Sequence, residues 1–238
     1  MSDQLTSAER DKKHRIKDMG ASEKITEAEM DEMGLIHPGM ENQSILNSYR
    51  EIRNKLLKLS DYRNFVCLVT SLNAKDETSL QALNLAAVFA FDKARSALVV
   101  DCTTSDNVID SILAVDEALG LIDFIESDYD DLSALVYECR LDRIRIIPAG
   151  NRSETRTETL ESTRMREIII ELKNRYPDRF IFINAPSMVL SSEVQVLSNV
   201  SDMVIFEMTP GTVTADQVKD AVEMIGAEKV AGILFQET

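Results

Sequence analysis

The sequence predicts an α/β protein, a three-layer sandwich in which a mostly parallel sheet lies between two layers of helices. From residue 65 onward, short apolar runs alternate with longer segments of helical period. The runs are apolar at consecutive positions, which is typical of strands that are buried on both faces. A chain of 238 residues with 44% apolar residues is also long enough to form one substantial core.

The alternation gives the order of the expected elements. The predicted strands are FVCLVT (65–70), ALVVD (97–101), IRIIPAG (144–150), FIFIN (180–184), MVIFEM (203–208) and VAGILF (230–235). The predicted helices cover 80–91, two short segments between 102 and 143, 163–176, 191–200 and 214–225. Because strands joined through helices are usually parallel, we expect helices on both faces of the sheet.

Two segments precede the first strand. Residues 1–40 are charged, contain few large apolar side chains and end in a Pro-Gly turn, so we expect a largely flexible arm with a short helix near Glu27–Met33. Its two histidines, His14 and His37, are expected to be exposed to solvent. The folded domain, 41–238, is then expected to begin with an amphipathic helix over 43–58.

In that helix, an apolar stripe is offset from Arg50 and Arg53. The residues of the stripe are Ile45, Tyr49, Ile52 and Leu56.

Charge and composition exclude several classes of function. The formal net charge of −15 disfavours nucleic acid and anionic lipid as partners. No segment resembles a signal peptide or a membrane span, so we expect a cytoplasmic protein without direct membrane insertion. Cys67, Cys102 and Cys139 lack the spacing of metal ligands, and we expect them to be buried, reduced thiols.

Ligands of parallel sheets bind beyond the carboxyl ends of the strands. The positions of interest are therefore Ser71, Asp101, Gly150, Asn184 and the residues from Met208 onward. The segment VTSLNAKDETS (69–79) lies between a strand and a helix, where a phosphate-binding loop belongs, yet it contains no glycine.

These strand ends resemble the cytoplasmic bacterial tyrosine-kinase family of capsule and exopolysaccharide synthesis, a branch of the deviant P-loop ATPases. The resemblance is carried by VTSLNAKDETS, NLA (84–86), ALVVD, and the order of PAG, ESTRM, YPDR and NAPS further on. It is greatest to the subgroup found with exosortase-type polysaccharide loci. The resemblance implies a sheet of the P-loop NTPase type.

Position by position, the resemblance implies that the nucleotide motifs are degenerate. The loop glycines are replaced by Lys75 and Glu77, the phosphate-binding lysine is replaced by Thr78, and the Mg²⁺-binding hydroxyl is kept at Ser79. In the second motif Asp101 is kept, but the partner aspartate is Thr103.

The two remaining motifs are altered as well. The third aspartate is Asn184, and the adenine-binding asparagine is Phe235. We therefore expect no catalytic residue, no ATP and no metal. The alternative is an active kinase or ATPase with an unusual loop, in which Lys75, Thr78, Ser79 and Asp101 would hold ATP and Mg²⁺.

The resemblance also implies assembly and a partner. The family's subunit-contact pattern E-x-x-R-x-x-R keeps Arg50 and Arg53 but has Asn47 in place of the glutamate. The alternative is a solvated arginine face. The expected partner is a chain-length-determining polysaccharide co-polymerase in the membrane or an intact kinase paralogue, in a homo- or hetero-oligomer. Such a partner would hold the chain at the inner membrane. The family's tyrosine-rich tail has no counterpart before Thr238.

Overall fold

The computed structural model describes residues 23–74, 78–103, 108–115, 118–127, 129–151, 155–189 and 191–235. His14, Lys75 and Glu77, which figure in the predictions above, lie outside these ranges.

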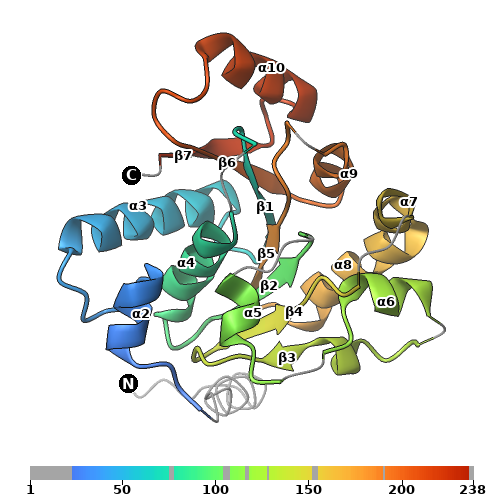
Figure 1. Ribbon diagram of the computed structural model, residues 1–238, viewed down its shortest axis with the longest axis horizontal. Coiled ribbons are helices and arrows are strands. Elements are labelled where there is room, and N and C mark those ends of the chain that lie inside the picture. Colours follow the sequence, from blue (N-terminus) through green and yellow to red (C-terminus); the bar gives the residue numbers. More distant parts are fainter. Residues whose placement is uncertain are drawn as a thin grey trace, which may run out of the picture.

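A seven-stranded sheet with the order β3-β4-β2-β5-β1-β6-β7 forms the centre of the described structure (Figure 1). All neighbouring strands are parallel except β3 and β4. The strands are β1 Val66–Ser71, β2 Ser96–Asp101, β3 Tyr137–Glu138, β4 Ile144–Ile147, β5 Arg179–Asn184, β6 Met203–Met208 and β7 Val230–Phe235. The six predicted strands are therefore present, whereas the short antiparallel strand β3 was not predicted.

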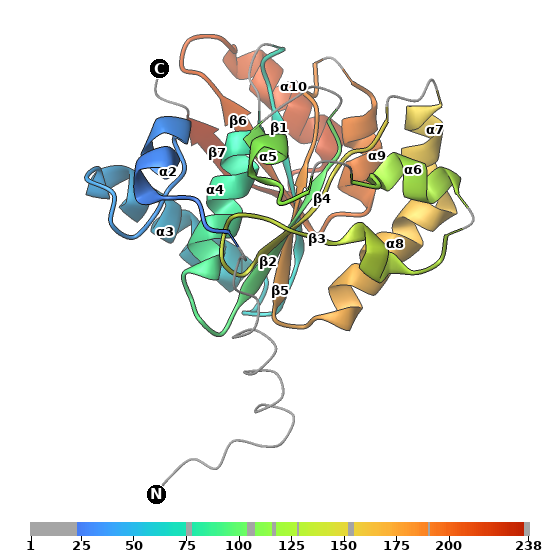
Figure 2. The same ribbon diagram turned by 60° about the horizontal axis from the view of Figure 1, so that its bottom comes forward.

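Helices cover both faces of the sheet, which confirms the predicted three layers (Figure 2). One face is covered by α2 Glu27–Met33, α3 Gln43–Leu59, α4 Ser79–Ala90 and α5 Val108–Ile112. The other face is covered by α6 Leu121–Glu126, α7 Arg156–Glu161, α8 Thr163–Arg175, α9 Glu193–Asn199 and α10 Ala215–Ile225. A 3-10 turn, η1, spans Leu132–Leu135.

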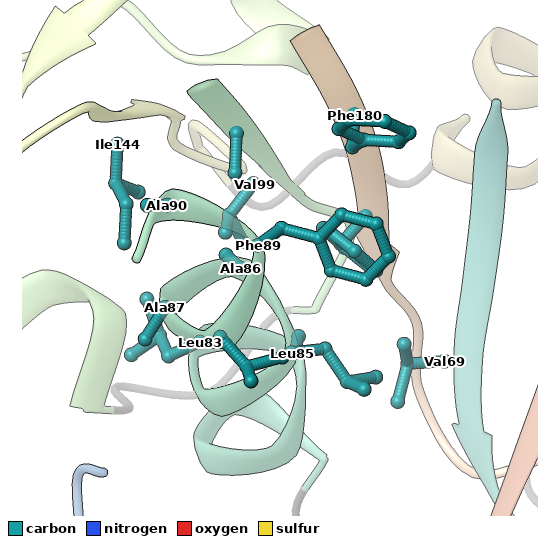
Figure 3. Packing of buried hydrophobic residues seen from close by; sticks show 14 of the residues in the cluster. Val69, Leu83, Leu85, Ala86, Ala87, Phe89, Ala90, Val99, Ile144 and Phe180 are labelled. Carbon is teal, nitrogen blue, oxygen red and sulfur yellow. The ribbon is translucent and has the colours of Figure 1, made fainter. Parts of the chain in front are cut away.

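Helix α4 is the best-buried helix of the first face. Eleven of its twelve residues are buried, because it lies between the sheet and α3 and is apolar nearly all round. Figure 3 shows Phe89 of α4 beside Phe180 of β5, and the two ring centroids are 4.6 Å apart. This packing fixes the N-terminus of α4 close to the carboxyl ends of the central strands.

Helix α3 confirms the predicted helix before the core, with one difference in its buried face. Leu46, Leu56 and Leu57 are buried, whereas Ile45 is 40% exposed. The predicted stripe through Ile45 is therefore wrong at its first turn. At the start of the helix the next residue, Leu46, is the one that packs in the core cluster.

Residues 23–40, which we call the N-terminal strap, lie on the core. Helix α2 has the predicted bounds and begins with a capping box in which Thr26 and Glu29 bond each other's backbone N–H groups. Ile25, Leu35 and Ile36 are buried in the same cluster as α4. The prediction of a flexible arm is therefore wrong for these residues, because a few well-placed apolar side chains suffice to dock a charged segment.

The docking of the strap also buries one histidine. His37 is 3% exposed, and its Nε2 lies 2.9 Å from Asp31 Oδ1 of α2. The prediction that His37 is exposed is wrong, because the strap packs on the core and its own Asp31 lies beside the ring. Asn84 of α4 holds the strap from beneath by accepting from Ile36 N at 2.9 Å and donating to Gly34 O at 3.1 Å.

Candidate functional site

The carboxyl ends of β1, β2 and β5 bring the predicted site residues together. Asp101 is paired in register with Asn184 on the neighbouring strand, and Asn184 is paired with Val69 of β1. The chain after β1 returns to the same edge at Thr78, immediately before α4. Thr78, Asp101, Thr103 and Asn184 form one cluster, which we call the strand-end network.

Hydrogen bonds run through the strand-end network. The Thr78 hydroxyl lies 2.6 Å from Asn184 Oδ1 and 2.9 Å from the Ala185 carbonyl, and it can donate to either. Asn184 Nδ2 donates to Asp101 Oδ1 at 2.9 Å. The same oxygen accepts from the backbone N–H and the hydroxyl of Thr103, at 3.0 and 2.9 Å.

The side chain at position 184 determines the direction of the hydrogen bonds in this network. An amide can accept on one side and donate on the other, so Asn184 joins a hydroxyl donor to a carboxylate acceptor. A carboxylate in its place would face Asp101 with like charge. The four side chains are also at least nine-tenths buried, so that each polar group needs a partner within the protein.

The described residues fit a magnesium-bound nucleotide poorly. Asp101 is a single carboxylate that already accepts bonds from Thr103 and Asn184, and Thr78 carries no charge that could offset phosphates. Within the described ranges, no group of three or more His, Cys, Asp or Glu side chains could hold a metal ion. Ser79 does lie at the start of α4, where it is buried.

A buried ion pair next to the network was not predicted from sequence. Arg156 of α7 donates from Nη2 to the Thr103 carbonyl at 3.3 Å, and its Nε lies 3.4 Å from Glu193 of α9. The two residues are 6% and 8% exposed. The segment TRTETLE around Arg156 has the composition of a solvated helix, so nothing local in the sequence indicates that its arginine is buried.

Gly150, the third predicted strand-end position, has a structural role instead. Its φ is +88°, and it lies so close to Gly120 that a Cβ on Gly120 would be 1.9 Å from Gly150 Cα. Asp123 in the first turn of α6 accepts from the N–H groups of Gly120 and Asn151, each at 3.2 Å. Gly150 therefore helps to seat the loop after β4 on the start of α6.

Phe235, the residue at the predicted adenine position, lies at the end of β7 and is 64% exposed. It lines a cavity of about 490 Å³ together with Tyr49 of α3, Gln81 of α4 and Glu207 of β6. Burial raises the pKa of Tyr49 to about 12, and the charge of Glu207 acts in the same direction. Phe235 contributes an exposed phenyl ring to this cavity, and Tyr49, Gln81 and Glu207 contribute its polar groups.

The arginines predicted to form an interface lie on α3, away from the strand ends. Arg50 Nη1 donates to Asn47 Oδ1 at 3.1 Å, within the same helix. Arg53 Nη1 donates to the Val88 carbonyl at 3.0 Å, near the C-terminus of α4. The two arginines are thus not equivalent, since Arg53 also joins two helices of its own chain.

The cysteine prediction is confirmed. Cys67, Cys102 and Cys139 are free and buried, and burial is the main cause that raises the pKa of each thiol, for Cys139 to about 12. Such thiols are unreactive at neutral pH. In the described part of the chain, no helix has the length and apolar character needed to cross a membrane.

Comparisons with known proteins identify relatives of this sequence and this fold. No family model matches the chain. The tyrosine-protein kinase CpsD of Streptococcus agalactiae serotype III is 22% identical over 184 residues, which are 76% of this chain and 78% of that protein. The kinase domain of the Escherichia coli tyrosine kinase ETK has a TM-score of 0.74 at 17% identity and covers 99% of this chain and 95% of its own.

The septum site-determining protein MinD of Pyrococcus horikoshii, solved with Mg-ADP, has a TM-score of 0.59 at 18% identity over 72% of this chain and 69% of its own. The sheet is thus of the P-loop NTPase type, as predicted. The sequence match to CpsD, together with the shared fold, makes this chain a homologue of the bacterial tyrosine-protein kinases.

Proposed function

We propose that this protein is a catalytically degenerate, tyrosine-kinase-like subunit that acts as an interaction or regulatory component of bacterial exopolysaccharide biosynthesis and export. The homology to CpsD supports the kinase-like origin. The observation that best supports a loss of catalytic activity is the side-chain amide of Asn184, which hydrogen-bonds both Thr78 and Asp101. The polar atoms of the strand ends are thereby directed at one another.

The physical argument concerns charge. Phosphoryl transfer depends on positioning and on electrostatic stabilisation by a phosphate-bound cation and carboxylate-held Mg²⁺. In the strand-end network, a neutral hydroxyl and a neutral amide occupy the positions at which the resemblance implies a lysine and an aspartate. Several losses at one site leave little to stabilise the transition state.

The proposed partner is a polysaccharide co-polymerase in the membrane or an intact kinase paralogue, and Arg50 and Arg53 are the proposed contact residues. The partner would hold the chain at the cytoplasmic side of the inner membrane. A second candidate function is an active tyrosine kinase or ATPase. It is favoured by Asp101 at the end of β2 and Ser79 at the start of α4, because the resemblance implies that both are kept from the family's nucleotide motifs.

Thermal unfolding with and without Mg·ATP tests the proposal. A ligand at a hundredfold excess over its dissociation constant would stabilise the fold by about 2.7 kcal/mol, whereas we expect no shift at about 5 mM Mg·ATP. An upward shift that the Asp101→Ala variant abolishes would contradict the proposal and support the active alternative.

A rescue variant provides the positive control. Lys75→Gly, Glu77→Gly, Thr78→Lys, Thr103→Asp and Asn184→Asp together return the loop glycines, the phosphate charge and the metal carboxylates. We expect this variant to bind Mg·ATP and to show the thermal shift that the natural chain lacks, because the helix N-terminus still faces the site. If the rescue variant folds but does not bind, the loss does not reside in these positions.

A further inference from the structure

A basic groove lies between α3 and the C-terminal end of α4. Its volume is about 530 Å³. Of the described residues, three arginines, Arg50, Arg53 and Arg95, and one carboxylate, Asp92, line it. This is unusual in a chain of net charge −15. A local concentration of positive charge on an acidic protein selects anions at that place.

The guanidinium groups of this arginine groove keep unused hydrogen-bonding capacity. Among the described residues, Arg50 and Arg53 each make one hydrogen bond through Nη1, to Asn47 Oδ1 and to the Val88 carbonyl respectively. Arg95 Nε lies 3.0 Å from Asp92, and the guanidinium lies over the Phe180 ring at 5.3 Å from its centroid. Arg95 Nη1 is buried and so is not a donor to the open groove. Each guanidinium carries further N–H donors in a planar fork that suits phosphate oxygens.

The three cations also repel one another. The pKa of Arg53 is lowered by burial first and then by the charges of Arg95 and Arg50, and Asp92 offsets only part of this. An anion bound between them would relieve the repulsion. The carbonyl groups at the C-terminus of α4, which would repel an anion, are partly satisfied because Arg53 bonds Val88 O and Arg143 Nε bonds Ala90 O at 2.8 Å.

The remaining walls of the groove are apolar. Pro38 of the N-terminal strap, Leu57 of α3 and Phe91 after α4 complete its lining. A free inorganic anion would leave these walls unused. A ligand that carries its charge on an aromatic stem would contact both the arginines and the apolar walls.

We propose that the arginine groove binds a phosphotyrosine side chain of a partner protein. The phosphate dianion matches the excess of two positive charges that three arginines and one aspartate leave, and the phenyl ring matches the apolar walls. This inference rests on the proposed function, because it gives the chemistry by which the Arg50 and Arg53 face recognises its partner. It needs no nucleotide, since the groove lies at the opposite end of α4 from the strand-end network.

Fluorescence polarisation with the full chain tests this proposal. The probe is a short, otherwise neutral labelled peptide with one phosphotyrosine, and its competitors are the same peptide with tyrosine or phosphoserine, and inorganic phosphate. We expect the phosphotyrosine peptide to bind at least about tenfold more tightly than the phosphoserine peptide, since only the former contacts the apolar walls. Binding should weaken with added salt.

The decisive variant is Arg50→Gln. In the described part of the chain Arg50 bonds only Asn47 of its own helix, so its loss should leave the fold intact. We expect about tenfold or greater loss of phosphotyrosine binding. The matched control is Arg63→Gln, which removes the same charge from an exposed side chain paired with Asp61 and should change binding less than about twofold.

Three results would overturn the inference: no phosphotyrosine binding at millimolar peptide, equal affinity for phosphotyrosine and phosphoserine, or equal losses in Arg50→Gln and Arg63→Gln. All measurements are made without nucleotide. Failure here therefore leaves the Mg·ATP result unchanged, and a thermal shift with Mg·ATP would leave the binding comparison unchanged.

Discussion

At the N-terminal end of α4, Thr78 bonds Asn184, which in turn bonds Asp101, and all three side chains are buried. At the C-terminal end of the same helix, three arginines line an open groove with one carboxylate among them. The first cluster satisfies its own polar groups, whereas the second keeps donors and positive charge in excess. In the function that we propose, binding takes place at the arginine groove and not at the strand-end network.

The largest loss of stability is expected at the buried ion pair next to the strand-end network. Arg156→Met would leave the Glu193 carboxylate buried without its cation, and we expect a loss of about 3 kcal/mol in the free energy of unfolding. Urea denaturation measures this loss. The double variant Arg156→Met, Glu193→Leu should recover most of it, and the exposed control Arg166→Met should change little. A double variant no more stable than the single one would show that the pair acts through something other than its charge.

A carboxylate at position 184 should make stability depend on pH. In Asn184→Asp, the amide that donates to Asp101 Oδ1 at 2.9 Å is replaced by a second carboxylate. Because two like charges cannot both be held so close together, the two carboxyl groups share a proton, and the pKa of the pair is raised in the folded state. The folded protein then binds more protons than the unfolded chain, and stability falls as pH rises from about 4 to 8. We expect a loss of about 2 kcal/mol at pH 8.

Denaturation midpoints at several pH values check this prediction. The control is Asn54→Asp on the exposed face of α3, whose midpoint should follow the natural chain. A loss in Asn184→Asp that is the same at pH 5 and pH 8 would contradict the description of the network as one that excludes a second charge.

Substitutions of Arg53 and Arg50 in the arginine groove should lower the free energy of unfolding by different amounts. Arg53→Ala removes the bond to the Val88 carbonyl at the end of α4, and we expect a loss of about 1 kcal/mol. Arg50→Ala removes an exposed contact within α3 and should cost less than about 0.5 kcal/mol. Thermal unfolding distinguishes them, and equal losses would mean that Arg53 is as free for a partner as Arg50.

The smallest effect concerns the strap that supplies Pro38 to the groove. Hydrogen bonds from the backbone and the side chain of Thr26, and from Arg140, lower the pKa of Glu29 to about 2. A lowered folded-state pKa gives stability above the ordinary value of 4.5 that is lost as pH falls toward 2. In Glu29→Gln, the free energy of unfolding should therefore depend less on pH between 4.5 and about 2 than in the natural chain. The exposed control Glu51→Gln should not show this change.

The sequence by itself determined the alternation of strands and helices, the layers and the position of the strand ends. It could do so because a strand buried on both faces must be continuously apolar, as in β5 and β6, and a helix between two layers must be apolar all round, as in α4. It also placed Asp101 and Asn184 at strand ends on one edge of the sheet, since parallel strands end at one edge, and the family resemblance added Thr78 and Thr103.

Only the tertiary structure decided what these side chains do to one another. Asn184 is a donor to Asp101 and an acceptor from Thr78 because β1, β2 and β5 are neighbours at a fixed register. Arg156 meets Glu193 because two separate helices, α7 and α9, pack together, and His37 is buried beside Asp31 because their common strap packs on the core. Charge patterns along a chain predict exposure, but burial of a charge depends on a partner brought from elsewhere in the fold.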